Sequence, residues 1–312
     1  MNNPSVIVIT GPTATGKTAL GVALAQKLNT EVISADSMQI YRRMDIGTAK
    51  PRREETMGIP HHMIDVADPT EDYSAARWVD EAGQKADALL AAGKMPLIVG
   101  GTGLYIDSLL SGRSFSAAPG DSGIRERLSA EYDAIGGAAM REKLAAVDPE
   151  RAARLAEGDK RRIVRSLEVY ELTGETITEH DRKTRLLPPR YPSVRFALTY
   201  RDRETLYRRI DARVDCMEAE GLFEEVESLL ARGLTDKHTA MQAIGYKEIV
   251  AALRGECTRQ EALDKVKQES RRYAKRQLTW LRRDKELHWL CREDCPTTGE
   301  ALDQICKILR QE

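Results

Sequence analysis

Short apolar runs alternate with helical patterns in the first third of the chain. The runs at residues 5–9, 31–34 and 94–99 are rich in Val, Ile and Leu and have the length of strands buried on both faces. Between them, residues 19–28 place leucines and alanines at helical spacing, and Ser74 is a typical N-cap for a later helix. Strands that alternate with helices predict an α/β fold built on a parallel sheet.

The pattern changes after residue 117, where strands are no longer indicated. Four consecutive amphipathic helices are predicted at residues 125–135, 138–146, 150–155 and 161–172. A strand pattern returns at 194–200, and helical patterns fill most of the remaining sequence. We therefore expect three segments, which are the first part of the α/β core in residues 1–117, a helical insertion domain in 118–190, and a return to the core with C-terminal helices in 191–312.

The octet GPTATGKT at residues 11–18 lies between the first predicted strand and the first predicted helix. It matches the P-loop pattern G-x-x-x-x-G-K-[ST], whose glycines let backbone N–H groups surround an anion at a helix N-terminus. Lys17 is then placed to reach the terminal phosphate, and the Thr18 hydroxyl is a candidate ligand for Mg²⁺. The predicted fold class is a P-loop NTPase-like parallel sheet flanked by helices, with a helical insertion domain.

A second carboxylate site, which P-loop NTPases use to hold Mg²⁺ at the end of another strand, is not where it is expected. The candidate strand in PLIVGGTGLY is followed by glycine and threonine instead of aspartate. Asp36 is the carboxylate best placed at a strand end, at the edge of the sheet where ligands bind. The pattern leaves three roles open for it: to steer a metal-bound water, to accept a proton from a nucleophile, or to cap the next helix.

Composition limits the class of protein further. The chain has 41% hydrophobic and 31% charged residues, no signal-peptide pattern and no apolar run long enough to cross a bilayer, so we expect a cytoplasmic protein that does not associate with membranes. The five cysteines and the His61–His62 pair lack the spacing of a zinc site. The net charge of −1 does not by itself indicate a nucleic-acid partner.

Positive charge is nevertheless concentrated locally. The segment RRYAKRQLTWLRR at residues 271–283 contains six basic residues and no acidic residue. On a helix, all six fall within an arc of about 140°. Exposed helices usually mix charges of both signs, so this cationic face favours RNA binding over a solvated surface. Arg161, Arg162 and Arg165 form a second basic cluster, inside the predicted insertion.

These segments together resemble one family, the tRNA dimethylallyltransferases, or bacterial tRNA isopentenyltransferases. The similar segments are GPTATGKT at 11–18, SADSMQIYRRMDIGTAKP at 34–51, PHHMIDVADPTEDYS at 60–74, VGGTGLY at 99–105, RRIVRSLEVYELTG at 161–174, AIGYKE at 243–248 and KRQLTWLRR at 275–283. The resemblance implies transfer of a dimethylallyl group from dimethylallyl pyrophosphate to N6 of the adenosine 3′-adjacent to the tRNA anticodon. It also implies release of pyrophosphate and a requirement for Mg²⁺.

The resemblance assigns roles to individual residues. Asp36 corresponds to the general base, Thr102 to a threonine of the reaction channel, and Lys17 to the residue that neutralises the leaving pyrophosphate. Arg209 corresponds to a pyrophosphate-binding arginine, although Arg208 and Arg213 lie close by in the sequence. The implied pyrophosphate loop consists of Gly11, Thr13, Ala14, Thr15, Gly16, Lys17 and Thr18.

The resemblance also implies contacts with the anticodon stem-loop of tRNA. The corresponding residues are Asp36, Ser37, Met38, Gln39, Thr102, Arg125, Arg161, Arg162, Arg165, Gln242, Gly245, Tyr246, Lys247, Lys275, Arg276, Gln277, Trp280 and Arg282. We expect the protein to act as a monomer.

Three other functions are compatible with parts of this sequence. A small-molecule or nucleoside kinase shares the P-loop, but it does not need the basic C-terminal helix or the GGTGLY segment. An adenylate isopentenyltransferase shares the chemistry, but it does not need the extended tRNA-contacting segments. A non-catalytic nucleotide-binding RNA adaptor has no use for Asp36 and Thr102 beside the loop.

Overall fold

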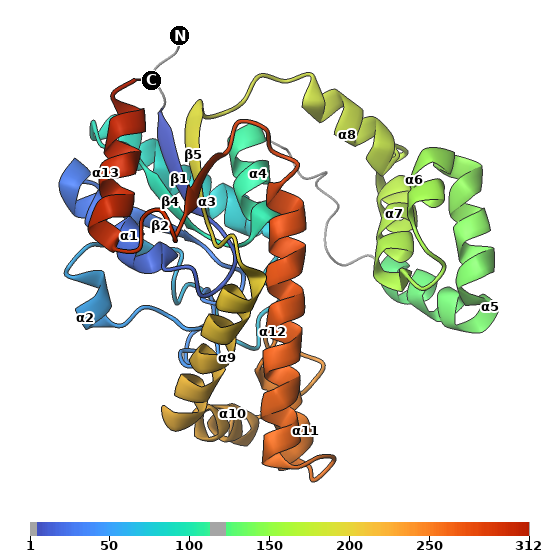
Figure 1. Ribbon diagram of the computed structural model, residues 1–312. Helices are drawn as coiled ribbons and strands as arrows, with labels where there is room; N and C mark the ends of the chain where they lie inside the picture. The colour runs from blue at the N-terminus through green and yellow to red at the C-terminus, as the bar shows by residue number, and fades with distance from the viewer. Residues whose placement is uncertain (1–4, 113–122, 312) are drawn as a thin grey trace. The chain divides into compact units, whose positions relative to one another are not determined.

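The computed structural model describes residues 5–112 and 123–311, which form two compact units (Figure 1). The larger unit contains the described residues up to Leu110 and those from Tyr191 onward, and the smaller unit begins at Ser111 and ends at Arg190. The boundary predicted between residues 117 and 118 lies outside the described residues.

A six-stranded parallel sheet forms the centre of the larger unit. Its strands are β1 (Val6–Thr10), β2 (Val32–Ala35), β3 (His61–His62), β4 (Leu97–Gly100), β5 (Ser193–Thr199) and β6 (His288–Cys291). They are ordered β3-β2-β4-β1-β5-β6, so β2, β4 and β1 are neighbours and their carboxyl ends meet at one edge. The predicted fold class is confirmed.

Helices cover both faces of this sheet (Figure 1). The helices of the larger unit are α1 (Lys17–Leu28), α2 (Arg53–Thr56), α3 (Ala75–Ala91), α4 (Gly103–Ser111), α9 (Arg203–Ala219), α10 (Leu222–Ala231), α11 (Tyr246–Leu253), α12 (Arg259–Leu281) and α13 (Thr298–Leu309). Of these, α10 packs against α9 and α11, and α11 packs against α12. The predicted N-cap is confirmed, because the Ser74 hydroxyl accepts the N–H of Arg77 at the start of α3. No helix in the described ranges is long and apolar enough to span a membrane.

The two faces of the sheet have separate cores. On one face, β1, β4 and β5 pack against α1 and α13, in a cluster that includes Ile7, Ile9, Leu20, Leu24, Phe196 and Ile305. On the other face, Trp78 of α3 donates its indole N–H to the backbone oxygen of Ser34 at 3.2 Å and stacks on Tyr105 of α4. This second face carries the helices that lie beside the carboxyl ends of β2 and β4.

The smaller unit is helical. It contains α5 (Ile124–Val147), α6 (Pro149–Arg154), α7 (Lys160–Thr173) and α8 (Ile177–Arg185). Gly136, with φ 84° and ψ 164°, interrupts α5 at the point where the sequence predicts one helix to end and the next to begin. Leu128, Met140, Leu144 and Ile163 form the centre of its buried core.

Two elements differ from the sequence prediction. Helix α8 is not among the predicted helices, and Thr176 and Glu179 form a capping box at its start. Helical patterns fill most of the sequence after residue 200, and within that region residues 288–291 form β6. This strand is only four residues long and pairs with β5 alone, so its identity depends on the neighbouring strand more than on its own pattern.

Candidate active site

The loop after β1 is held in a conformation suited to surrounding an anion. Gly11 has a φ of 137°, and a Cβ atom there would lie 2.4 Å from the backbone oxygen of Leu198 on β5. Gly16, with φ 88°, directly precedes α1. Both positions favour glycine strongly. The N-terminus of α1 therefore lies open to an anion, with its N–H groups and the positive end of its dipole directed at the loop.

Lys17, the first residue of α1, turns its ammonium group back into this loop. Nζ donates a hydrogen bond to the backbone oxygen of Pro12 at 2.8 Å, and the Thr15 hydroxyl donates to the same oxygen at 2.9 Å. Burial of the ammonium, and secondarily the positive charge of Arg213, lower the pKa of Lys17 from 10.5 to about 7, against an opposing effect of Asp36. An anion bound in the loop would stabilise the protonated form.

Asp36 lies directly after β2, at the same edge of the sheet. Its Oδ1 atom accepts the backbone N–H groups of Met38 at 2.9 Å and Gln39 at 3.3 Å. These bonds fix the carboxylate in the turn that follows the strand. The Oδ2 atom makes no hydrogen bond within the described residues, so it is the oxygen that can accept a proton. Asp36 also contributes to the electrostatic surroundings of both Lys17 and Arg213.

Thr102 follows β4 and fastens the loop that carries Asp36. Its hydroxyl oxygen accepts the N–H of Ser37 at 3.2 Å, and the hydroxyl group also hydrogen-bonds with Tyr273 of α12. Burial, and then the negative charge of Asp36, raise the pKa of Tyr273 to about 12. Burial likewise raises the pKa of Tyr105. Both phenols are therefore neutral around the carboxylate at physiological pH.

The sequence leaves three arginines of α9 as alternatives for the pyrophosphate-binding residue, and their contacts in the structure differ. Arg209 donates from Nε to the backbone oxygen of Ala14 at 3.0 Å, and Arg213 donates to the Thr13 hydroxyl at 3.1 Å. Arg208 instead donates to a hydroxyl one turn earlier on its own helix. Arg209 and Arg213 thus both reach the phosphate-binding loop, and Arg208 does not.

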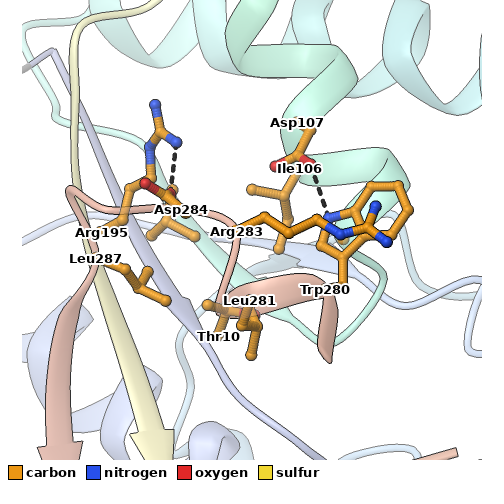
Figure 2. Close-up of a pocket in the computed structure, with 11 residues that line it drawn as sticks. Thr10, Ile106, Asp107, Arg195, Trp280, Leu281, Arg283, Asp284 and Leu287 are labelled. Atoms are coloured by element: carbon orange, nitrogen blue, oxygen red, sulfur yellow. Dashed lines mark hydrogen bonds and ion pairs between the residues drawn. The ribbon is translucent and has the colours of Figure 1, made fainter. Parts of the chain in front are cut away.

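Gln277 joins this loop to the segment after β4. Its Oε1 atom accepts the N–H of Thr13 at 3.1 Å, and its Nε2 atom donates to the backbone oxygen of Gly101 at 2.9 Å. A Cβ atom on Gly101 would lie 2.3 Å from that nitrogen, so a larger residue there would displace the Gln277 amide. One turn later, Trp280 packs on Gly103 and donates its indole N–H to Asp107 at 2.7 Å (Figure 2).

The fold and the site together define a class of protein. It is an α/β protein with a P-loop, in which a strand-end carboxylate, a threonine and two arginines surround the anion position without a carboxylate at the end of β4. That arrangement suits the departure of a phosphate-containing group with simultaneous loss of a proton from the nucleophile.

Comparison with known proteins identifies the family. The profile of the IPP transferase family matches residues 39–284, and that of an isopentenyl transferase family matches residues 4–68. The chain belongs to the IPP transferase family. The relative named tRNA dimethylallyltransferase from Desulforudis audaxviator is 46% identical over 99% of both chains. A protein of the same name from Geobacillus thermodenitrificans is 47% identical over 97% of this chain and 96% of its own.

Solved structures agree with this assignment. The crystal structure of the full-length tRNA isopentenylpyrophosphate transferase from Bacillus halodurans has a TM-score of 0.71 and 40% identity, and the match covers 98% of this chain and 97% of that one. A eukaryotic dimethylallyltransferase acting on tRNA has a TM-score of 0.75 and 31% identity, with coverage of 88% and 69%. The resemblance seen in the sequence is confirmed.

The positions predicted to contact tRNA fall on separate elements. Ser37, Met38 and Gln39 follow Asp36. Gln242 ends the short 3-10 helix Ala240–Gln242, Gly245 directly precedes α11, and Tyr246 and Lys247 begin it. Lys275, Arg276, Gln277 and Trp280 lie on α12, with Arg282 directly after it. In the smaller unit, Arg125 and Arg165 both pair with the carboxylate of Glu168, which is only 3% exposed. Arg161 is exposed, and Arg162 lies 3.9 Å from Asp159.

The predicted cationic face of six residues on one helix differs in two ways from the structure: α12 ends at Leu281, before Arg282 and Arg283, and two of the six residues are ion-paired. Arg271 pairs with Asp211 of α9 at 2.5 Å, and Arg272 pairs with Glu269 of its own helix at 2.7 Å. The acidic partners come from outside the segment or just before it, so the segment's own composition could not reveal them. Lys275, Arg276 and Arg282 are exposed and form no ion pair within the described residues.

Sequence reasoning did not select Tyr105 or Tyr273. Tyr105 ends the GGTGLY segment, in which the sequence points only to the glycines and Thr102. Tyr273 lies four residues before Gln277 and therefore on the same face of α12. That spacing, measured from Gln277, is the signal that identifies it.

Proposed function

We propose that this chain transfers a dimethylallyl group from dimethylallyl pyrophosphate to N6 of the adenosine 3′-adjacent to the tRNA anticodon, releasing pyrophosphate. The single observation that carries the proposal is the placement of Asp36 beside Lys17 and Arg213 at the carboxyl edge of the sheet. This geometry joins a proton acceptor to an anion site, as alkyl transfer from a pyrophosphate requires. We expect the reaction to take place in the cytoplasm, with the protein as a monomer.

In the proposed reaction, the adenine N6 attacks C1 of the dimethylallyl group. The new N–C bond forms as the bond from C1 to the pyrophosphate oxygen breaks, and the electron pair leaves with that oxygen. The exocyclic amine is a weak nucleophile that must lose a proton, which Asp36 accepts on the oxygen not held by the Met38 and Gln39 N–H groups. Thr102 holds the turn that carries this carboxylate.

The leaving pyrophosphate is stabilised by the groups of the loop. Lys17, Arg209 and Arg213 supply positive charge, and the N-terminus of α1 supplies oriented N–H groups. The neutral side chains of Tyr105 and Tyr273 lie around the carboxylate and limit the access of water. Water exclusion protects the allylic electrophile from hydrolysis.

The donor groups present fit a Mg²⁺ ion that is held largely by the substrate. The Thr18 hydroxyl makes no hydrogen bond within the described residues, and those residues assemble no group of three or more His, Cys, Asp or Glu side chains. Mg²⁺ usually binds substrate phosphates, waters and one or two protein oxygens. Thr18 would supply one such oxygen, and the ion would neutralise pyrophosphate charge.

The target adenosine has to leave its base stack to reach a carboxylate inside the protein, so we propose base flipping. The exposed cations Lys275, Arg276 and Arg282, which form no ion pair within the described residues, supply phosphate contacts near the site, and Arg161 supplies one from the smaller unit. These contacts position the RNA without reading its sequence. The segment Ser37–Gln39 is left to contact the flipped nucleotide or its neighbours.

We expect substitution of Arg209 or Arg213 to raise the KM for dimethylallyl pyrophosphate, and substitution of Arg208 to leave it nearly unchanged. Arg213→Gln or Arg209→Gln should raise the KM for dimethylallyl pyrophosphate by about tenfold, since each removes a charge aimed at the leaving group. Arg208→Gln is the matched control and should change this KM by less than about twofold. Equal effects at positions 208 and 213 would contradict the assignment.

The proposed function is tested by supplying the protein with Mg²⁺, dimethylallyl pyrophosphate labelled in the prenyl group, and either unmodified tRNA or AMP. We expect the label in tRNA. Incorporation into AMP alone indicates an adenylate isopentenyltransferase. Phosphate transfer from labelled ATP in place of prenyl transfer indicates a kinase, and either of these results contradicts the proposal.

A further inference from the structure

Glu225 on α10 accepts four hydrogen bonds from two distant segments. Its Oε2 atom accepts the backbone N–H groups of Asp45 at 2.8 Å and Ile46 at 2.7 Å. Its Oε1 atom accepts the N–H of Gly47 at 3.0 Å and the hydroxyl of Tyr246 at 2.6 Å. A carboxylate has about four acceptor sites, so this one is fully used by protein groups.

The two segments held by Glu225 also pack directly on each other. Tyr246 is fully buried, and a Cβ atom on Gly47 would lie 2.6 Å from its ring. Tyr246 belongs to the predicted tRNA-contacting segment, yet its buried ring cannot touch RNA. Its side chain can therefore support a tRNA contact only indirectly, by holding Gly47 and Glu225 in place.

The loop at 45–47 is connected to the catalytic turn by further hydrogen bonds. Gln39 donates from its amide to the backbone oxygens of Thr48 at 3.2 Å and Ala49 at 3.1 Å, and its own backbone N–H binds Asp36. A shift of residues 45–47 would therefore move Thr48 and Ala49, and with them the side chain of Gln39. By contrast, the phosphate-binding loop is held by Gln277, Arg209 and Arg213, and not by this network.

We propose that Glu225 is a positioning residue for the RNA substrate, which keeps the turn after Asp36 and the turn before α11 in register for tRNA binding without touching the donor. The inference rests on the proposed function, because it assigns the two turns to tRNA. We therefore expect loss of the carboxylate to affect the two substrates differently. The protein should bind RNA more weakly, whereas its binding of the pyrophosphate donor should not change.

The test is steady-state kinetics of Glu225→Gln with an anticodon stem-loop RNA and dimethylallyl pyrophosphate. An amide in place of the carboxylate turns an NH₂ group toward N–H donors, so the loop must shift. We expect the KM for RNA to rise by about tenfold or more and the KM for the donor to stay within about twofold. Tyr246→Phe, which removes one donor of the four, should raise the KM for RNA less, by about threefold.

Glu224→Gln is the matched control, because Glu224 is the exposed neighbour on the same helix, and it should behave as the wild type. Equal rises in both KM values, or an unchanged KM for RNA, would overturn the proposal. If Glu225→Gln does not fold, Tyr246→Phe decides, and an unchanged KM for RNA in that variant overturns it. Failure of the wild-type protein to prenylate RNA would instead contradict the proposed function itself.

Discussion

Asp36→Asn is expected to lower the rate of prenyl transfer to tRNA by about 10²- to 10⁴-fold, the usual contribution of a positioned general base. The asparagine side-chain oxygen can still accept the N–H groups of Met38 and Gln39, so the turn should keep its shape. What is lost is the free oxygen that takes the proton of the adenine amine. The KM values for tRNA and donor should therefore change little, and the loss should appear in kcat.

Single-turnover kinetics with saturating tRNA and donor measures this effect. Asp80→Asn provides a control, since Asp80 is exposed on α3 and lies outside the site, and it should retain wild-type activity. Full activity in Asp36→Asn would show that the carboxylate is not the proton acceptor. A large rise in KM with unchanged kcat would assign Asp36 to binding instead.

The second large effect is expected at Lys17. Lys17→Met should lower kcat/KM for dimethylallyl pyrophosphate by about 10²- to 10³-fold, because it removes the ammonium group that points into the phosphate-binding loop. Lys27→Met, at an exposed position of the same helix, is the control and should leave kcat/KM unchanged. Comparable losses in both variants would assign the effect to α1 as a whole.

The pH dependence of the reaction gives an independent test of Lys17. Its pKa of about 7 in the folded protein means that the ammonium loses its proton above neutral pH. In wild-type protein, kcat/KM for the donor should fall as the pH rises above 7, and Lys17→Met should lack this step.

The same shift affects the stability of the ligand-free protein. The unfolded chain keeps the lysine proton up to about pH 10.5, whereas the folded protein releases it near 7. This group therefore destabilises the fold below pH 7, and the destabilisation is relieved as the pH rises from 7 to 10.5. Thermal unfolding of wild type and Lys17→Met across this range measures the contribution.

Much of the fold and the centre of the site could be predicted from local sequence patterns. The strands at the carboxyl edge and the P-loop are encoded within a few consecutive residues, so Lys17 and Asp36 could be identified from the pattern. Helices α5, α6 and α7 of the smaller unit likewise follow from their own amphipathic spacing, whereas α8 was not predicted. β6 could not be predicted in this way, because a four-residue edge strand depends on its partner β5.

Contacts between distant segments account for what the sequence did not reveal. Arg213 and Gln277 reach the P-loop from positions 200 and 264 residues away, and no local pattern indicates those approaches. The pairing of Arg271 with Asp211 similarly joins two helices and removes a cation from the face predicted on α12. The family resemblance identified Asp36 and Thr102, but the residues that hold their loops had to come from the structure.

In the proposed reaction, the P-loop holds the pyrophosphate of a prenyl donor while Asp36 deprotonates an adenosine of tRNA. Mass spectrometry of nuclease-digested tRNA after reaction, combined with measurement of released phosphate species, tests this most directly. We expect one dimethylallyl group on N6 of the adenosine 3′-adjacent to the anticodon and one pyrophosphate released for each group transferred. A prenyl group at another nucleotide or atom, or orthophosphate as the released product, would contradict it.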